Sequence, residues 1–168
     1  GKTKVDAESI VMKSKNSVAY RLATVFGYSY RMRSDLLVNN FVYTAVRKKK
    51  LTIFEPHFRR NYIHIDDVVN AIVFSISNFN KLKSNVYNLG LSSANLTKYM
   101  LANKIKQKLK YLKIIIVKNR KDPDQRDYYV SNKKIEKKGF KAKIKIEDGI
   151  NELIKIFTNS NDKIINNY

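Results

Sequence analysis

The sequence of 168 residues contains no cysteine and no tryptophan, and it has only two prolines and five glycines. The absence of cysteine excludes a disulfide framework and a metal site built on thiolates, and it fits a reducing compartment. The longest apolar runs, such as residues 71–74 and 114–117, are far too short to cross a bilayer. We therefore expect a cytoplasmic protein that has no membrane partner.

The scarcity of glycine limits how the chain binds a nucleotide. Glycine occurs at positions 1, 27, 90, 139 and 149, and these positions form neither G-x-G-x-x-G nor a P-loop. Such turns hold a pyrophosphate group at the N-terminus of a helix. If the protein binds a dinucleotide, we expect its main nucleotide loop to lie outside this sequence.

Acidic residues are scarce as well: 14 stand against 34 basic residues, and the net charge is +20. A basic module for RNA or an anionic surface is therefore an alternative, and its binding would weaken steeply with salt. However, 26 lysines occur with 18 asparagines and 18 isoleucines, a joint enrichment typical of AT-rich genomes. No aromatic residues alternate with the basic ones as in a base-stacking surface. We expect no specific nucleic-acid partner, although an anionic small ligand suits this charge.

The hydrophobic pattern predicts alternating strands and helices, and therefore an α/β fold with parallel strands. Ser34 or Asp35, and then Asp66 or Asp67, are expected to cap two of the helices, and Thr97 to begin a third. Strands are expected at 17–26, 51–54, 61–65, 85–89 and 113–117, and helices at 2–15, 35–49, 66–77, 97–109, 131–139 and 147–157. A sheet of this kind binds its ligand at the carboxyl ends of the strands.

Five segments in this order carry a family resemblance: GKTKVDAE (1–8), RLATVFG (21–27), RRNYIHIDDVVNAI (59–72), VYNLG (86–90) and DPDQRDYYVSNKKIEKKGF (122–140). The series resembles the C-terminal half of an extended short-chain dehydrogenase/reductase of the NAD-dependent epimerase/dehydratase family. The resemblance implies the C-terminal part of a Rossmann-type NAD(P)-binding fold together with a small α/β substrate-binding subdomain. It spans residues 1–157, and residues 158–168 are expected to form a polar tail.

The first segment resembles the family's catalytic signature, Tyr-x-x-x-Lys followed by a glutamate. Lys4 and Glu8 occupy the lysine and glutamate positions, and the tyrosine would be the residue before Gly1, so we expect the chain to start inside the signature. A tyrosine has a pKa of about 10, and a lysine one helical turn away favours the phenolate. The resemblance makes Lys4 a catalytic and cofactor-binding residue, and its helix the interface of a homodimer. Two alternatives are a Lys4–Glu8 pair on a solvated helix face and a non-catalytic relative.

The later segments, together with Asp35 between the second and the third segment, supply the other candidate site residues. By resemblance, Ala23 and Thr24 lie against the nicotinamide, and Thr24 also contacts the sugar. Asp35, Arg60 and Arg126 occupy positions that bind the nucleotide diphosphate in the family. A guanidinium suits phosphate because its donors form a rigid fork.

Two further expectations concern the remaining polar residues. His64 reads as a core histidine rather than a base. His57 has no cysteine or acidic neighbours at ligand spacing, so no metal site is expected.

The resemblance implies a function for the longer parent protein. It would transfer hydride between NAD, with NADP as the alternative, and a nucleotide-diphosphate sugar, which leads to epimerisation, elimination or reduction. Because the chain lacks the dinucleotide loop and the tyrosine, we expect it to be inactive alone. We also expect its sheet to have an unpaired edge where the first strands would belong.

Overall fold

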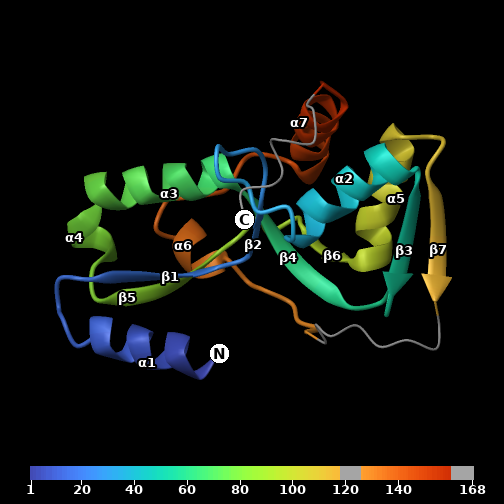
Figure 1. The fold of residues 1–168 in the computed structure, drawn as a ribbon. Coiled ribbons are helices and arrows are strands. Elements are labelled where there is room, and N and C mark those ends of the chain that lie inside the picture. Colours follow the sequence, from blue (N-terminus) through green and yellow to red (C-terminus); the bar gives the residue numbers. More distant parts are fainter. Residues whose placement is uncertain (118–125, 160–168) are drawn as a thin grey trace.

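The computed structural model describes residues 1–117 and 126–159, which form seven helices and seven strands (Figure 1). The helices are α1 (Lys2–Val11), α2 (Leu37–Lys48), α3 (Ile65–Ser77), α4 (Phe79–Leu82), α5 (Lys98–Lys108), α6 (Lys133–Glu136) and α7 (Ile146–Asn159). The strands are β1 (Val18–Leu22), β2 (Thr24–Phe26), β3 (Lys50–Phe54), β4 (Arg59–His64), β5 (Asn85–Leu89), β6 (Asn95–Thr97) and β7 (Lys113–Val117). The predicted alternation of helices and strands is confirmed.

The strands form three small sheets. β1 pairs in parallel with β5, and β3 pairs in parallel with β7. Between these two pairs, β4 is parallel to β2 and antiparallel to β6, in the order β2–β4–β6. In Figure 1, α1 and α3 lie on opposite faces of the β1–β5 pair.

One strand predicted for residues 17–26 is in fact two. The N–H of Ala23 still donates to the carbonyl of Leu89 in β5, at 2.9 Å, but Thr24 already pairs with Tyr62 in β4. Ala23 is therefore the residue at which the chain leaves one sheet and enters the next. The apolar run conceals this change because both halves are extended and apolar.

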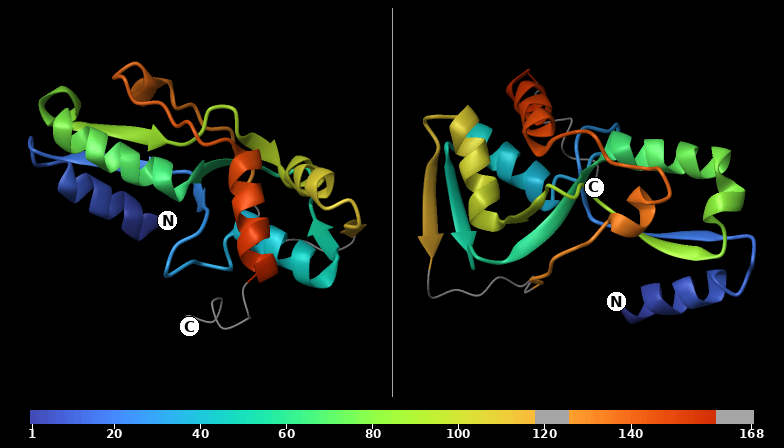
Figure 2. Two further views of the ribbon diagram at one scale, coloured as in Figure 1. Left: turned by 90° about the horizontal axis from the view of Figure 1, so that it is seen from above. Right: turned by 180° about the vertical axis from the view of Figure 1, so that it is seen from behind.

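The main core lies among α2, α5 and α7, which gather beside β3 and β7 (Figure 2). In α7, Ile146, Ile150, Leu153 and Phe157 are buried. Their spacing of three or four residues places them on one helix face. α7 extends to Asn159, two residues beyond the predicted end, and the rest of the predicted tail, 160–168, lies outside the described residues.

Two of the predicted helix caps are wrong. α2 begins after Leu36 without a side-chain cap, and Asp35 pairs with Arg33 instead. At the start of α3 the cap is His64, whose ring accepts the N–H of Asp66. Thr97 does cap α5, since its hydroxyl accepts the N–H of Met100 at 3.1 Å. At Asp35, the ion pair with Arg33 thus takes the carboxylate that was expected to cap α2.

Within residues 1–117 and 126–159, neither β1 nor β5 pairs with a further strand, so both edges of this two-stranded sheet lack a strand partner. The unpaired edge of β1 agrees with the expectation of an unpaired sheet edge. No helix in the described part of the chain is both long and apolar enough to cross a membrane.

Candidate functional site

A cavity of about 470 Å³ lies at the end of β2 and along the loop that leads to α2; we name it the strand-end pocket. Its lining consists of residues 22–27, Ser29, 31–33, Leu36, Asn39, Ile65, Arg126 and Tyr128. The pocket therefore lies where ligands bind in open α/β sheets, beyond the carboxyl end of a parallel strand.

A second cavity of about 290 Å³ adjoins the first; we name it the cationic pocket. It is lined by Thr24, Arg33, Asp35, Leu36, Leu37, Arg60, Lys98 and Arg126. Thr24, Arg33, Leu36 and Arg126 line both cavities, so the two pockets meet in one cleft.

The structure brings together most of the candidate residues from the sequence. Thr24, Asp35, Arg60 and Arg126, the four predicted substrate-binding residues, all line the cationic pocket. Ala23 and Thr24, predicted to bind the cofactor, line the strand-end pocket. Their ligands remain predictions. Five segments of the chain converge at the two pockets: β2, the loop before α2, β4, the start of α5 and the segment around Arg126.

Lys4 is the exception, because it lines neither pocket. It is exposed on α1, a helix without buried residues. Glu8 does not pair with it: the Glu8 carboxylate accepts two hydrogen bonds from Arg21, at 2.6 and 2.9 Å. These bonds hold the pKa of Glu8 below its usual range and join α1 to β1.

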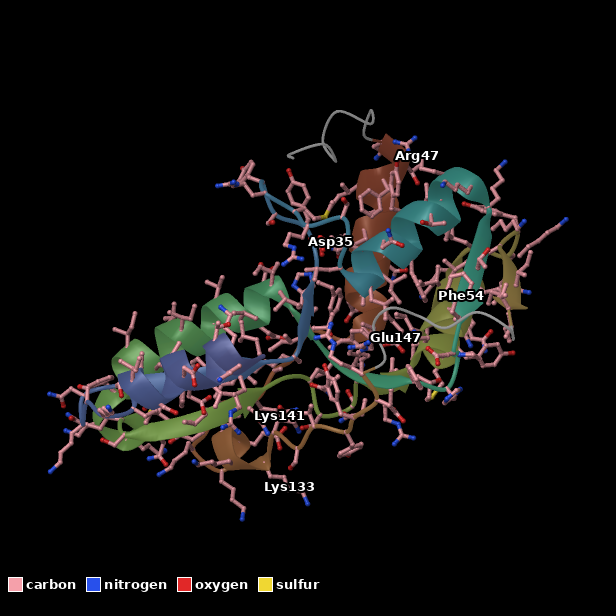
Figure 3. The ribbon with its side chains drawn as sticks, turned by 60° about the horizontal axis from the view of Figure 1, so that its bottom comes forward. Asp35, Arg47, Phe54, Lys133, Lys141 and Glu147 are labelled. Carbon is pink, nitrogen blue, oxygen red and sulfur yellow. The ribbon has the colours of Figure 1, made fainter. Side chains whose placement is uncertain are left out.

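The cationic pocket carries more positive than negative side chains. Four of the lining residues are basic (Arg33, Arg60, Lys98 and Arg126) and one is acidic, Asp35. Asp35 lies in the loop before α2 (Figure 3), and its carboxylate is bound by Arg33 at 2.5 and 3.0 Å. Hydrogen bonding from Arg33 lowers the pKa of Asp35, so this carboxylate is ionised and already neutralised at neutral pH.

Two of the four cations are buried. Arg60 is 3% exposed and lies 5.8 Å from the ring centre of Tyr128, and Lys98 is 2% exposed. Sequence analysis missed Lys98, because a lysine in a predicted lysine-rich helix gives no signal of burial. A buried cation that lines a cavity is well placed to bind an anion there, because little solvent screens its charge.

The loop between the two pockets is fixed by Asn39, which sequence analysis also missed. The side-chain oxygen of Asn39 accepts the N–H of Gly27 at 3.1 Å, and its amide donates to the carbonyl of Arg33 at 3.0 Å. Gly27 has a φ of +111°, and a Cβ there would lie 2.5 Å from Nε2 of His64. A glycine is therefore required where β2 ends against the histidine.

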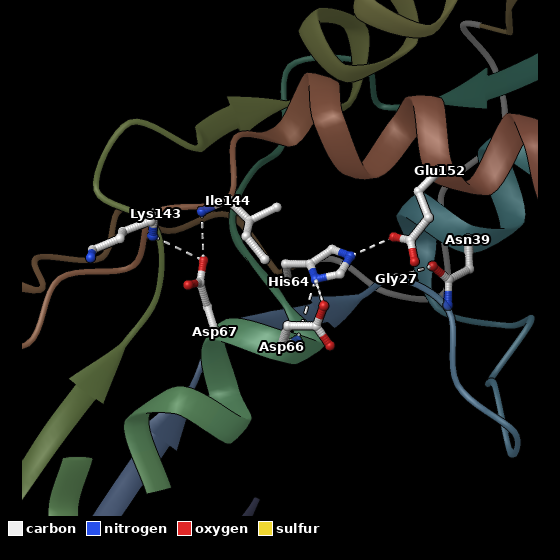
Figure 4. A network of polar contacts seen from close by, with 8 residues as sticks. All are labelled: Gly27, Asn39, His64, Asp66, Asp67, Lys143, Ile144 and Glu152. Atoms are coloured by element: carbon white, nitrogen blue, oxygen red, sulfur yellow. Dashed lines mark hydrogen bonds and ion pairs between the residues drawn. The ribbon is translucent and has the colours of Figure 1, made fainter. Parts of the chain in front are cut away.

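His64 is a core residue, as predicted, and connects β4 to α7 (Figure 4). Its Nδ1 accepts the N–H of Asp66 at 3.3 Å, which leaves the proton on Nε2 to be donated to Glu152 at 2.6 Å. Nearby, Asp67 accepts the N–H groups of Lys143 and Ile144 at 3.0 and 2.9 Å. These contacts tie the start of α3 to α7 and to the segment before it.

Tyr62 is buried in β4, and its hydroxyl has no hydrogen-bond partner among the described residues. Burial raises the pKa of this phenol far above its usual value, and the charge of Arg60 offsets only part of that effect. No cluster of three or more metal-ligating side chains occurs in the described ranges.

A family model matches the first half of the chain. The model of the NAD dependent epimerase/dehydratase family matches residues 3–90, which include α1, β1, β2, β4 and β5. The match covers the segments that carry Lys4, Ala23, Thr24, Asp35 and Arg60. It therefore covers more than half of the chain.

Solved structures share the fold. A dTDP-glucose 4,6-dehydratase from Bacillus anthracis in complex with NAD superimposes with a TM-score of 0.76 at 20% identity, over 96% of this chain and 52% of that one. RMD from Pseudomonas aeruginosa, complexed with NADPH, superimposes with a TM-score of 0.74 at 17% identity, over 91% of this chain and 54% of that one. The UDP-glucose 4-epimerase from Thermotoga maritima with UDP-glucose superimposes with a TM-score of 0.64 at 23% identity, over 84% of this chain and 45% of that one.

The chain thus spans about half the length of these proteins. At these identities the likeness establishes the fold, a part of a Rossmann-type α/β structure, while the family follows from the sequence match. The chain belongs to the NAD-dependent epimerase/dehydratase family.

Proposed function

We propose that residues 1–157 form the C-terminal, substrate-binding portion of a longer enzyme that epimerises, dehydrates or reduces a nucleotide-diphosphate sugar with NAD. The observation that carries this proposal is the meeting of a cationic pocket and a strand-end pocket on Thr24 and Arg126. A sugar diphosphate has the matching division into an anionic part and a polar, uncharged part.

The cationic pocket would hold the diphosphate. Arg60 extends from β4 into its lining, and Arg126 lines the boundary with the strand-end pocket. A guanidinium binds two phosphate oxygens at once, and such charge-assisted bonds are stronger than neutral ones. The Arg33–Asp35 pair leaves the excess charge of the pocket positive.

The strand-end pocket would hold the sugar, with the nicotinamide against its wall. Ala23 and Thr24 form that wall, and the Thr24 hydroxyl is able both to donate and to accept a hydrogen bond. These residues fit one side of a nicotinamide, whereas no glycine-rich loop for its diphosphate is present in the sequence. NAD, when bound, supplies reversible hydride acceptance, and NADP is the alternative cofactor.

Lys4 belongs to the proposal through its motif. Its ammonium would bind the cofactor ribose and lower the pKa of the acid/base tyrosine of the longer enzyme. The helix that bears it, α1, would form the homodimer interface. We expect the longer enzyme to act in the cytoplasm and the present chain to be inactive alone.

Calorimetric titration of the chain with UDP-glucose and dTDP-glucose tests the substrate class. We expect binding of at least one of them, and Arg60→Met should weaken it about tenfold or more, because a charge-assisted bond is lost. Arg47→Met, on the exposed end of α2, is the matched control and should change nothing. Equal affinity in the Arg60 and Arg47 variants would contradict the assignment of the cationic pocket.

A second measurement separates an enzyme from a non-catalytic relative. In the longer protein, Lys4→Met should abolish reduction of bound NAD at 340 nm while the affinity for the nucleotide sugar is retained. A non-catalytic relative would show no reduction in either form.

A further inference from the structure

Lys98 occupies a position in which a lysine is unfavourable for the fold itself. It is the first residue of α5, an 11-residue helix, and it is 2% exposed. A positive charge at the N-terminus of a helix opposes the macrodipole, and burial of an ammonium group removes its hydration. The position therefore has two costs, which contacts of the ammonium group must offset.

The contacts of Lys98 hold its ammonium beside the cationic pocket. Its Nζ donates to the carbonyl of Phe54 at 3.2 Å and lies 5.2 Å from the ring centre of Phe58. The backbone N–H of Lys98 donates to the Phe58 carbonyl at 3.1 Å. The side chain is thus fixed to the end of β3 and the backbone to the loop before β4, so the side chain has little freedom to lose when a ligand binds.

The lining of the cationic pocket falls into two groups. Arg60 and Lys98 are 3% and 2% exposed, and they line only this pocket. Arg33 and Arg126 are exposed and line both pockets. One buried pair of cations therefore lines only the cationic pocket, and an exposed pair lies where the two pockets meet.

We propose that Lys98 is a phosphate-binding residue that acts together with Arg60, and that it makes the pocket select a diphosphate over a single phosphate. The inference rests on the proposed function, which assigns the diphosphate to this pocket. Four cations line the pocket, and one of them, Arg33, is bound to Asp35, so the excess positive charge matches two linked phosphate groups, whereas one phosphate engages only part of the lining. Charge thus selects the substrate class here, independently of the sugar.

Titration of the chain with inorganic pyrophosphate and with inorganic phosphate tests the inference. Lys98→Gln is the main variant, because its amide is still able to donate to the Phe54 carbonyl while the charge is lost. We expect the dissociation constant for pyrophosphate to rise about tenfold or more, as for loss of a charge-assisted bond, and that for phosphate to rise less. Lys98→Met, measured in parallel, removes both the charge and the bond.

Two controls separate a binding role from a structural one. Lys104→Gln alters a lysine of the same helix that pairs with Glu147 outside the pocket, and it should leave both constants unchanged. Thermal unfolding without ligand shows whether each variant is folded. If Lys98 has only a structural role, its variants should have a lower melting temperature, and their affinities for pyrophosphate and phosphate should fall by the same factor.

The outcomes distinguish this inference from the proposed function. If Arg60→Met weakens pyrophosphate binding but neither Lys98 variant does, the role of Lys98 is wrong and the diphosphate site stands. If the unaltered chain binds neither anion, the diphosphate assignment fails and the role of Lys98 fails with it. If the Lys98 variants lose selectivity between the two anions, the inference is confirmed.

Discussion

The two ends of the molecule differ in how completely they bury their helices. At one end, α2, α5 and α7 enclose a core in which residues such as Val42, Ile105 and Ile150 are fully buried. At the other end, α1 buries none of its residues, and α3 leaves an apolar face exposed by 49–74%. That α3 face consists of Val69, Ile72, Val73 and Ile76.

The candidate site lies between these ends and depends mainly on the enclosed one. Arg60 and Lys98 are positioned by β4 and α5, and Asn39 of α2 fixes the loop that carries Arg33. An exposed apolar face of this size is a feature of surfaces that contact another polypeptide. The described residues thus form both pockets, whereas the α1 and α3 faces remain open.

The largest effect should come from truncation of the same residue type at the two ends. Ile105→Ala, in the core face of α5, should lower the free energy of unfolding by about 2–5 kcal/mol because it leaves a cavity. Ile76→Ala on α3, where the side chain is 74% exposed, should change it by less than about 0.5 kcal/mol. Urea unfolding measures both, and equal losses would show that the α3 face is buried in solution.

The next effect should come from the contact that joins the two ends. Asp67→Ala removes the acceptor of two backbone N–H groups before α7 and should cost about 2–3 kcal/mol in the free energy of unfolding. Glu8→Gln, which breaks the exposed pair with Arg21, is the control and should cause no measurable change. A small loss for Asp67→Ala would mean that other contacts, such as the His64–Glu152 hydrogen bond, suffice to hold α3 to α7.

A smaller effect should distinguish two buried tyrosines. Tyr62→Phe removes a hydroxyl without a described partner and should stabilise the chain by about 1 kcal/mol. Tyr87→Phe should destabilise it by about 1 kcal/mol, because that hydroxyl donates to the Leu82 carbonyl at 3.3 Å. Chemical unfolding at pH 7 gives both values, and the opposite order would contradict the burial of an unpaired hydroxyl at Tyr62.

Tyr62 also predicts a dependence on pH. Burial raises the pKa of the Tyr62 phenol in the folded state, so the folded protein keeps this proton where the unfolded chain loses it. The free energy of unfolding is therefore unaffected by this group below the unfolded pKa of about 10 and falls as the pH rises above that value. The decline in stability above about pH 10 should therefore be shallower in Tyr62→Phe. An unchanged decline would mean that other groups govern alkaline unfolding.

The smallest effect on stability, with a visible effect on association, should come from the α3 face. Ile72→Gln combined with Ile76→Gln should lower dye binding and self-association while the free energy of unfolding changes by less than about 0.5 kcal/mol. Lys81→Gln, an exposed change on α4, is the matched control. Sedimentation velocity measures association, and no difference from the control would show that the face does not mediate it.

Local pattern predicted the fold well where one partner decides the structure. The strands at 85–89 and 113–117 have the predicted bounds, since each is a short segment rich in strand-forming residues that is closed by a turn or charged residue. The strand at 17–26 was predicted as one because the pairing that divides it at Ala23 is a tertiary choice. The caps at Asp35 and Asp66 were wrong because Arg33 and His64 provide competing contacts.

The candidate site could be predicted only as far as motif residues reach. Thr24, Arg60 and Arg126 were named from their motifs, and Asp35 from a position that is polar in some relatives. They meet because a strand end, a loop and a neighbouring strand converge. Lys98 and Asn39 lie in no motif, and lysine and asparagine are both abundant in this sequence. Only their burial distinguishes them from the other lysines and asparagines. Lys4 was named from the spacing of the Tyr-x-x-x-Lys signature, and it lines neither of the two pockets.

Ala23 has a mechanical consequence, because it is the joint between two sheets. Leu22 on one side of it ends β1, Thr24 on the other begins β2, and all three residues line the strand-end pocket. A ligand filling both pockets would touch β1, β2, β4 and α5 together. Such a ligand would contact both the β1–β5 sheet and the β2–β4–β6 sheet, and it would restrict their movement relative to each other at Ala23.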